Sequence, residues 1–252
     1  MKTYDSTSVK SKWTKTNWLL GSAATREHMP STMPFNRRNL IHLLDKYTTV
    51  FFKPTNGSGG FRIIRITKLD NGYRTQHNTS KITHAGIKEL YRHLNAKAKR
   101  RDYLLQKGIK LDKANGRPYD IRVMVQKAND GRWKTTALFT KIGQPGKVAT
   151  NYNQGGKIGY FRQTLADAGC SEQVITHKKE QLERLGEATG KLFDQHASGF
   201  RELGLDVALD ERGRIWILEV NTKPQFYPLK QLKHKSMYHT IMSYAKQYGR
   251  KK

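Results

Sequence analysis

The chain has 252 residues, of which 36% are hydrophobic, and 47 Lys and Arg residues against 20 Asp and Glu residues give it a net charge of +27. This length suits one compact domain, or two lobes that share a cleft, and the apolar content is sufficient for a core. One cysteine, Cys170, excludes an intrachain disulfide framework, and no run approaches the roughly 18 apolar residues of a membrane span. The first residues show no apolar segment of a secretory signal, so we expect a cytoplasmic protein.

The excess of positive charge predicts attraction to polyanions through a long-range field that salt weakens. An acidic polypeptide, a nucleic acid or an anionic surface would meet this description, and a solvated basic surface that only aids solubility is the alternative. Lys and Arg are spread along the chain, apart from runs at 97–101 and 250–252. No recognition helix, zinc-ligand spacing or aromatic RNA-binding run is visible, so the sequence predicts no specific nucleic-acid motif.

The N-terminal part, residues 1–47, is predicted to be a lead-in that packs on the core. Residues 1–34 predict a short helix and then an extended segment stiffened by Pro30 and Pro34. Residues 39–47 have apolar side chains at the spacing of an amphipathic helix.

A glycine-rich segment follows, with a strand on each side of it. Residues 49–66 predict a strand that Pro54 ends, a turn rich in glycine at 57–60, and a second strand. Glycines allow backbone N–H groups to approach a phosphate closely, and Lys53 would add a positive charge there. The segment matches neither the Walker A pattern nor the dinucleotide-binding fingerprint, so a simple turn is the alternative.

The middle of the chain alternates between helical and strand patterns. A helix is predicted over 82–98 and a strand over 103–109, so that residues 48–105 form a small lid of hairpin and helix. A strand over 119–126 places Asp120 and Arg122 on one face, where they could pair with each other. The remaining expectations are a strand over 133–142 that carries Lys141, a polar glycine loop over 151–156, and a helix over 178–193.

A β-hairpin is predicted near the C-terminus. The apolar runs 205–209 and 215–220 flank Asp-Glu-Arg-Gly, a typical turn sequence. A tight turn centred on the Arg-Gly pair would place Asp206 opposite Glu219. Asn221 would share their face, diagonal to Asp206 and within about 8 Å of it.

Opposed carboxylates destabilise a sheet, so this hairpin predicts a compensating cation. Mg²⁺ takes one or two carboxylates together with water and phosphate oxygens, and Asp206, Glu219 and Asn221 offer such a partial set of ligands. The alternative is that these side chains lie on a solvated face. The flanking runs have the pattern of buried strands, which favours the metal site.

In this order the segments resemble the YheC/YheD endospore coat-associated family of the ATP-grasp superfamily. The resemblance implies an α+β fold with nucleotide in a cleft between a small lid lobe, residues 48–105, and a larger, mostly antiparallel lobe, residues 106–252. The motifs that carry it are Phe52-Lys53-Pro54 with Gly57-Ser58-Gly59-Gly60, Leu105-Gln106-Lys107-Gly108-Ile109, Asp120-Ile121-Arg122, Asn151 with Gly155-Gly156, and Leu205-Asp206-Val207 with Leu218-Glu219-Val220-Asn221-Thr222-Lys223-Pro224.

The family resemblance also implies roles for these residues. Lys53 and the loop Gly57, Ser58, Gly59 and Gly60 would contact ATP phosphates, and the backbone of Gln106, Lys107, Gly108 and Ile109 would hold the adenine. Arg122 and Lys141 would be catalytic and face the γ-phosphate and an acyl phosphate. Asp206, Glu219 and Asn221 would hold Mg²⁺ or Mn²⁺, with Asn151 on the acceptor side. The chain departs from many ATP-grasp ligases at Gln225, where glycine is common, and at Gln106 and Lys107, where a carboxylate often binds the ribose.

The resemblance implies an ATP- and Mg²⁺-dependent ligase that joins an unidentified carboxylate to an amine, or a similar nucleophile, through an acyl phosphate. It also makes a role in sporulation and a place in the spore coat an expectation. The alternative is a nucleotide-binding, catalytically idle protein that serves as a basic coat or assembly component and binds an acidic partner. The predicted metal ligands, together with Lys53 and Arg122, favour the enzyme.

Overall fold

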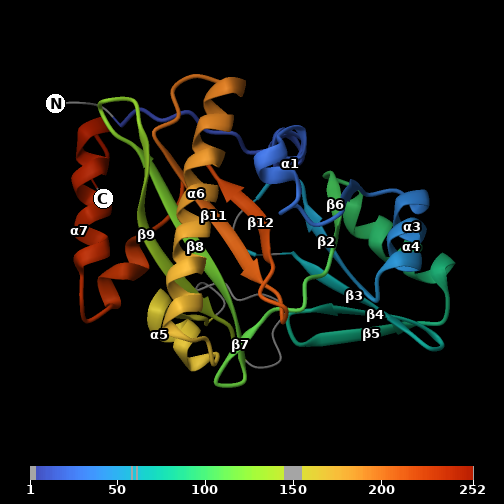
Figure 1. Cartoon of the computed structure of the whole chain (residues 1–252). Helices are drawn as coiled ribbons and strands as arrows, with labels where there is room; N and C mark the ends of the chain where they lie inside the picture. Colours follow the sequence, from blue (N-terminus) through green and yellow to red (C-terminus); the bar gives the residue numbers. More distant parts are fainter. Residues whose placement is uncertain (1–3, 58, 61, 145–154, 252) are drawn as a thin grey trace.

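The computed structural model describes residues 4–57, 59–60, 62–144 and 155–251 (Figure 1). They form two antiparallel β-sheets that lie beside each other, with helices packed on both, and this is the α+β class predicted from the sequence. None of the described helices is both long and apolar enough to cross a membrane.

The smaller sheet has the strand order β1-β6-β2-β3-β4-β5, and neighbouring strands are antiparallel. Helices α3 and α4 cover one face, where Leu40 and Leu90 pack with Val50 and Phe52 of β2. The opposite face points toward the larger sheet. The elements are β1 (Thr32–Pro34), α3 (Arg37–Lys46), β2 (Thr49–Pro54), β3 (Ile64–Leu69), β4 (Gly72–His77), β5 (Ser80–His84), α4 (Ile87–Ala98) and β6 (Tyr103–Lys107).

The larger sheet has the order β10-β9-β8-β11-β12, with β7 paired to β8. Helix α6 covers one face, where Leu182 and Leu185 pack against Val123 and Val125. Helix α7 covers part of the other face, where Ile241 packs against Met124. The elements are β7 (Lys113–Ala114), β8 (Arg117–Lys127), β9 (Trp133–Ile142), β10 (Lys157–Tyr160), α5 (Phe161–Asp167), α6 (Glu172–His196), β11 (Glu202–Leu209), β12 (Ile215–Asn221) and α7 (Ser236–Ala245).

The N-terminal residues serve both sheets. Helices α1 (Lys12–Gly21) and α2 (Ala23–Arg26) pack near α6, and Leu19 belongs to the core of the larger sheet. Strand β1 and helix α3, by contrast, belong to the smaller sheet. The predicted lead-in, residues 1–47, therefore contributes to two cores, and its boundary with the lid stays a prediction.

The helix predicted over 82–98 is wrong at its start. Residues Ser80–His84 form strand β5, which pairs with β4, and helix α4 begins only at Ile87, after Gly86 in an extended conformation. Asn78 adopts a left-handed conformation with φ 53° in the turn between the strands. This hairpin provides backbone partners for residues 80–84, and these outweigh a helical side-chain spacing that is local to the sequence.

The predicted pairing of Asp206 with Glu219 is confirmed, although the turn differs from the one expected. The turn spans one residue more, because Asp210 and Arg214 bond to each other across it, with Gly213 at φ 71°. A bulge between Asp206 and Val207 then shifts the register by one residue, since Val207 pairs with Ile217. The two shifts cancel at Asp206, and the bulge leaves Leu218 without a partner on β11.

Candidate functional site

One face of the larger sheet changes character along its length. Near α7 it carries apolar side chains such as Met124, Ala137 and Phe139. Toward the smaller sheet it carries Asp120, Arg122, Lys141 and Asp206, all of them buried or nearly so. Buried charged groups are stable only when they are paired, so this end of the face must be a network of ion pairs.

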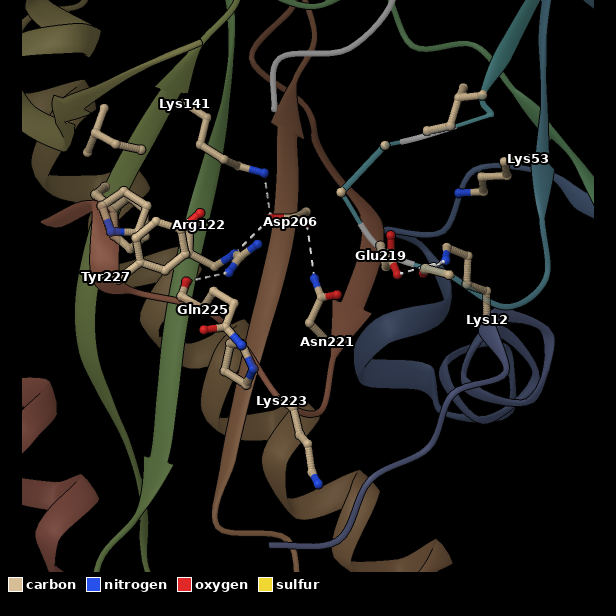
Figure 2. Close-up of a pocket in the computed structure, with 18 of the residues that line it drawn as sticks. Lys12, Lys53, Arg122, Lys141, Asp206, Glu219, Asn221, Lys223, Gln225 and Tyr227 are labelled. Atoms are coloured by element: carbon tan, nitrogen blue, oxygen red, sulfur yellow. Dashed lines mark hydrogen bonds and ion pairs between the residues drawn. The ribbon is translucent and has the colours of Figure 1, made fainter. Parts of the chain in front are cut away.

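Asp206 lies at the centre of that network (Figure 2). Its Oδ1 accepts from Arg122 Nε at 2.8 Å and from Lys141 Nζ at 2.8 Å, and its Oδ2 accepts from Asn221 Nδ2 at 3.1 Å. Lys141 Nζ also lies 2.9 Å from Asp120 Oδ1. Asp120 therefore pairs with Lys141, whereas the sequence had suggested Arg122. Burial raises the pKa of Asp206, but the charges of Arg122 and Lys141 outweigh burial and hold that pKa well below its usual range.

Lys53 approaches from the smaller sheet. Its Nζ donates to Gln106 Oε1 at 2.7 Å and to the carbonyl oxygen of Leu218 at 3.2 Å. Leu218 is the residue that the bulge leaves without a partner on β11, and its carbonyl oxygen accepts a hydrogen bond from Lys53. Burial lowers the pKa of Lys53 to about 8, against the attraction of Glu219, which raises it. The hydrogen bonds of the Lys53 ammonium thus go to neutral oxygens, and the attraction of Glu219 does not offset the cost of its burial.

A further lysine comes from the N-terminal helix. Lys12 is the first residue of α1, whose N-cap Ser11 accepts from Thr14 N, and its ammonium lies 3.3 Å from Glu219 Oε1. It also donates to the carbonyl oxygen of Gly57 in the glycine-rich segment. Lys12 thus ties the segment after β2 to the predicted metal ligand Glu219 (Figure 2).

These side chains surround a cavity of about 190 Å³ between the two sheets (Figure 2). Among the described residues of its lining, cations outnumber acids by five to two, so the cavity suits a ligand with several negative charges. The cations are Lys12, Lys53, Arg122, Lys141 and Lys223, the acids are Asp206 and Glu219, and the other lining residues include Gly57, Gly59, Gly60, Phe139, Ile158, Asn221, Pro224, Gln225 and Tyr227.

The donor set fits a metal ion that is shared with phosphate. Asp206, Glu219 and Asn221 all line the cavity and offer hard oxygen ligands. Within the described ranges no group of three or more His, Cys, Asp or Glu side chains forms a metal cluster, so the protein by itself offers an incomplete shell. Side-chain cations already pair with the opposed carboxylates, because Arg122 and Lys141 contact Asp206 and Lys12 contacts Glu219. The metal-binding role of Asp206, Glu219 and Asn221 stays a prediction.

The predicted adenine-binding segment lies apart from the described cavity lining. The backbone N–H groups of Lys107 and Gly108 already bond to Ser31 O and Thr49 O, each at 2.8 Å. The Lys107 ammonium lies over the ring of Trp216, 4.5 Å from its centroid. Gln106 bonds through its side chain, because its Nε2 donates to Thr32 Oγ1 at 3.0 Å while its Oε1 holds Lys53. The adenine role of residues 106–109 stays a prediction.

The structure thus gathers most of the residues singled out from the sequence, namely Lys53, Gly57, Gly59, Gly60, Arg122, Lys141, Asp206, Glu219 and Asn221. Ser58 and Asn151 lie outside the described residues. Sequence reasoning missed Lys12, Lys223 and Tyr227. Lys223 and Tyr227 follow the hairpin directly and could have been found from that proximity, whereas no local pattern connects Lys12 to Glu219.

Comparison with known proteins identifies the family. A model described as YheC/D like ATP-grasp matches residues 2–251. The endospore coat-associated proteins YheD and YheC of Bacillus subtilis (strain 168) are 28% and 25% identical, over 79% and 84% of this chain. The matches cover 46% of YheD and 59% of YheC, so the chain spans about half the length of these relatives.

Solved structures share the fold. A D-alanine-D-alanine ligase from Coxiella burnetii superposes with a TM-score of 0.52 and 13% identity, over 94% of this chain and 57% of the ligase. An N5-carboxyaminoimidazole synthase from Aspergillus clavatus, in complex with ADP and 5-aminoimidazole ribonucleotide, superposes with a TM-score of 0.56 and 11% identity, over 95% of this chain and 52% of the synthase. The fold is therefore the ATP-grasp fold, as the resemblance implied, and the chain belongs to the YheC/D-like ATP-grasp family.

Proposed function

We propose that the chain binds ATP with Mg²⁺ in the cavity between its two sheets and uses it to join a carboxylate to an amine or a similar nucleophile. The observation that carries this proposal is the lining of the cavity, which brings an excess of cations and the oxygen donors of Asp206, Glu219 and Asn221 to one place. A polyphosphate needs both kinds of group, cations for its oxygens and carboxylates for the metal that accompanies it.

Phosphate recognition would come from both sides of the cavity. Lys12 and Lys53 approach from the side of the smaller sheet and the glycine-rich segment, while Arg122 and Lys141 approach from the larger sheet. Positive groups on opposite sides of a phosphoryl group hold it in place and stabilise the charge that it develops during transfer. Asp206, Glu219 and Asn221 would hold Mg²⁺, which when bound adds positive charge beside the phosphates.

The reaction that fits this lining has two steps. A carboxylate oxygen of the substrate attacks the γ-phosphorus of ATP, the bond from that phosphorus to the β,γ-bridging oxygen breaks, and ADP leaves. An amine nitrogen then attacks the acyl carbon, the carbon–oxygen bond to the phosphoryl group breaks, phosphate leaves, and the nitrogen releases a proton to solvent. Arg122 and Lys141 are the side chains that we assign to stabilising the negative charge in both steps.

A second function rests on the net charge of +27 and on the relatives, which carry the name endospore coat-associated. In this proposal the chain binds nucleotide without turnover and serves as a basic component of a coat or another assembly, held by an acidic partner. Both functions use the cavity for nucleotide, and the presence of Arg122 and Lys141 beside the oxygen donors Asp206, Glu219 and Asn221 favours the first, because phosphoryl transfer needs cations at the transferred group in addition to binding.

The test uses Glu219→Gln, with Glu211→Gln as a matched control. Glu211 lies in the turn of the same hairpin, and its pair with Lys110 is exposed, so that variant makes the same chemical change away from the cavity. Mg²⁺–ADP should raise the melting temperature of the parent and of the control, because a ligand that binds the folded state stabilises it. Glu219→Gln should gain little, since an amide oxygen is a weaker ligand for Mg²⁺. An equal gain in all three proteins would remove Glu219 from the metal site.

Turnover distinguishes the two functions. The parent would be incubated with ATP, Mg²⁺ and pools of amino acids and acidic peptides, and the release of ADP and phosphate would be followed. Release that depends on both a carboxylate and an amine supports the ligase. Binding of ADP without turnover for any pool, together with stable binding to an acidic polymer, would favour the assembly component.

A further inference from the structure

A second hollow lies on the smaller sheet, outside the candidate site. It is a groove of about 410 Å³ between the C-terminal end of α4, strands β3 and β4, and the start of β6. Its rim is strongly basic, and its side chains come from three separate parts of the chain. The residues that line it are Arg62, Ile64, His77, Ala96, Lys97, Lys99, Arg100, Arg101 and Tyr103.

The basic side chains of the groove form no ion pair with any described carboxylate, although Asp102 follows Arg101 in the chain. No described carboxylate comes within 4.0 Å of the charged groups of Arg62, Lys97 or Lys99, nor of those of Arg100 and Arg101. These five residues and His77 are exposed. Like charges gathered without partners repel one another, and an anion bound among them relieves that repulsion.

The end of α4 explains only part of this cluster. Cations are favoured near the C-terminus of a helix, where the carbonyl dipoles point outward, and this accounts for Lys97 in its last turn. Arg62 precedes β3 and His77 ends β4, so the same effect does not place them there. Separate elements therefore converge on the groove, as expected of a binding surface.

The floor of the groove decides which polyanion it suits. Ile64 and Tyr103 are only 3% and 6% exposed, and the Tyr103 ring is stacked on Phe52 with centroids 4.0 Å apart. The bases of a nucleic-acid strand stack on exposed aromatic rings, whereas the Tyr103 ring is buried and stacks on Phe52 in the core. An acidic polypeptide needs no stacking, because its carboxylates reach the rim while its aliphatic stems cover the apolar floor.

The groove is also separate from the candidate site. Arg62 and Ile64 line the groove, whereas Ile63 between them lines the cavity that contains Asp206. We propose that the groove is a docking site for an acidic segment of another polypeptide, which binds the outer surface of the lid while the nucleotide cavity stays accessible. This assignment does not depend on the proposed ligase activity, because the two hollows share no lining residue.

The experiment measures binding of a fluorescein-labelled oligoglutamate peptide by anisotropy at physiological salt. The groove variant is Lys97→Glu/Arg100→Glu. The control is Lys113→Glu/Lys191→Glu, which makes the same change of net charge at exposed positions of the larger lobe. The groove variant should bind the peptide about tenfold more weakly or worse, because like charges would then face it, whereas the control should lose about threefold or less.

Three results would overturn the proposal. Equal losses in both variants would show that only net charge attracts the peptide. Displacement of the peptide by ATP would place it in the cavity with Asp206. Tighter binding of a single-stranded oligonucleotide of equal charge, with the same response to the groove variant, would assign the groove to nucleic acid. The melting shift with Mg²⁺–ADP is measured on both variants and should be retained, so a failure of nucleotide binding is seen separately.

Discussion

Strand β11 carries two carboxylates on one face, the buried Glu202 and the half-buried Asp206, and their surroundings differ. Glu202 is fully buried, accepts from Tyr4 Oη and Tyr248 Oη at 2.7 Å each, and pairs with Arg250. Asp206 pairs with Arg122 and Lys141, and its side chain keeps 14% of its exposure. Both are ion-paired acids, but Asp206 lines the described cavity between the sheets and Glu202 is not part of that lining.

The difference comes from what covers each end of the strand. Tyr4, Tyr248 and Arg250, which lie near the two ends of the chain, cover Glu202. Burial and the nearby negative charge of Glu202 raise the pKa values of Tyr4 and Tyr248 far above their usual range, so both tyrosines stay protonated and donate hydrogen bonds. Beside Asp206, a cavity between the two sheets leaves space for a ligand. The comparison teaches that burial and ion pairing do not distinguish a candidate ligand-binding carboxylate from a structural one. The open volume beside Asp206 is what makes it the candidate.

The largest expected effect is on stability, from Glu202→Gln. This change leaves the buried Arg250 without its carboxylate, which should lower the free energy of unfolding by roughly 3 kcal/mol, measured by urea denaturation. The melting shift with Mg²⁺–ADP should persist. Adding Arg250→Met should recover part of the loss, since removing both charges leaves neither unpaired. A Glu202→Gln protein that kept its stability but lost the melting shift with Mg²⁺–ADP would contradict the structural role assigned to Glu202.

Asp206→Asn should have a smaller effect on stability, about 2 kcal/mol, because water and anions can reach Arg122 and Lys141 through the cavity. Turnover should fall at least about 100-fold, as for the loss of a central electrostatic group. Pyrophosphate should restore much of the lost melting temperature, because it can occupy the same positive site. It should do nothing for Glu202→Gln. Rescue of both variants, or of neither, would contradict this account.

Lys53→Met should change stability with pH. The folded pKa of about 8 lies below the ordinary 10.5, so the unfolded chain binds more protons between these values and stability rises with pH across that window. Below pH 8 the penalty is fully present, and Lys53→Met should remove it. At pH 7 the variant should gain up to about 3 kcal/mol in the free energy of unfolding, less the contribution of the two hydrogen bonds that Lys53 makes. This gain should vanish near pH 10.5. ATP affinity should fall about tenfold.

The control for this variant is Lys46→Met, an exposed lysine on α3. It should change neither the pH profile of stability nor the affinity for ATP. Denaturation at pH 7 and at pH 10, with parallel ATP titrations, gives both quantities. A Lys53→Met protein with the parent's pH profile would show that Lys53 is not desolvated.

The smallest expected effect is that of Gly204→Ala, which lies between the two clusters. An added Cβ would lie 2.6 Å from Pro224 Cβ and 3.2 Å from Arg122 Cδ, so both must move. The free energy of unfolding should fall by about 1 kcal/mol. The affinity of the folded protein for ATP should also fall, because Arg122 lines the cavity and would be displaced. Gly21→Ala, whose Cβ meets nothing within 4 Å, is the control. Equal behaviour of the two variants would argue that Arg122 tolerates the shift.

Patterns that repeat within a strand or a turn were predictable. The two apolar runs predicted the hairpin, and the strand predicted over 133–142 appears with these bounds as β9. Asp206 was predicted opposite Glu219 from a turn one residue too short, and the bulge between Asp206 and Val207 offsets that difference. The helix predicted over 82–98 failed at its first residues, where pairing with β4 overrides the local spacing. The pairing of Arg122 with Asp206 was also missed, since it joins strands that are far apart in sequence.

The sequence by itself determined the order of the motifs, the hairpin with its carboxylates and the excess of positive charge, because these depend on neighbouring residues or on composition. Only the tertiary structure brought Lys12 from the first helix to Glu219, turned Gln106 toward Lys53, and gathered Arg62 and His77 beside the end of α4. These contacts depend on how the helices and sheets pack. Packing is set by the fit of many distant side chains at once, and the local periodicity of a sequence carries no record of it.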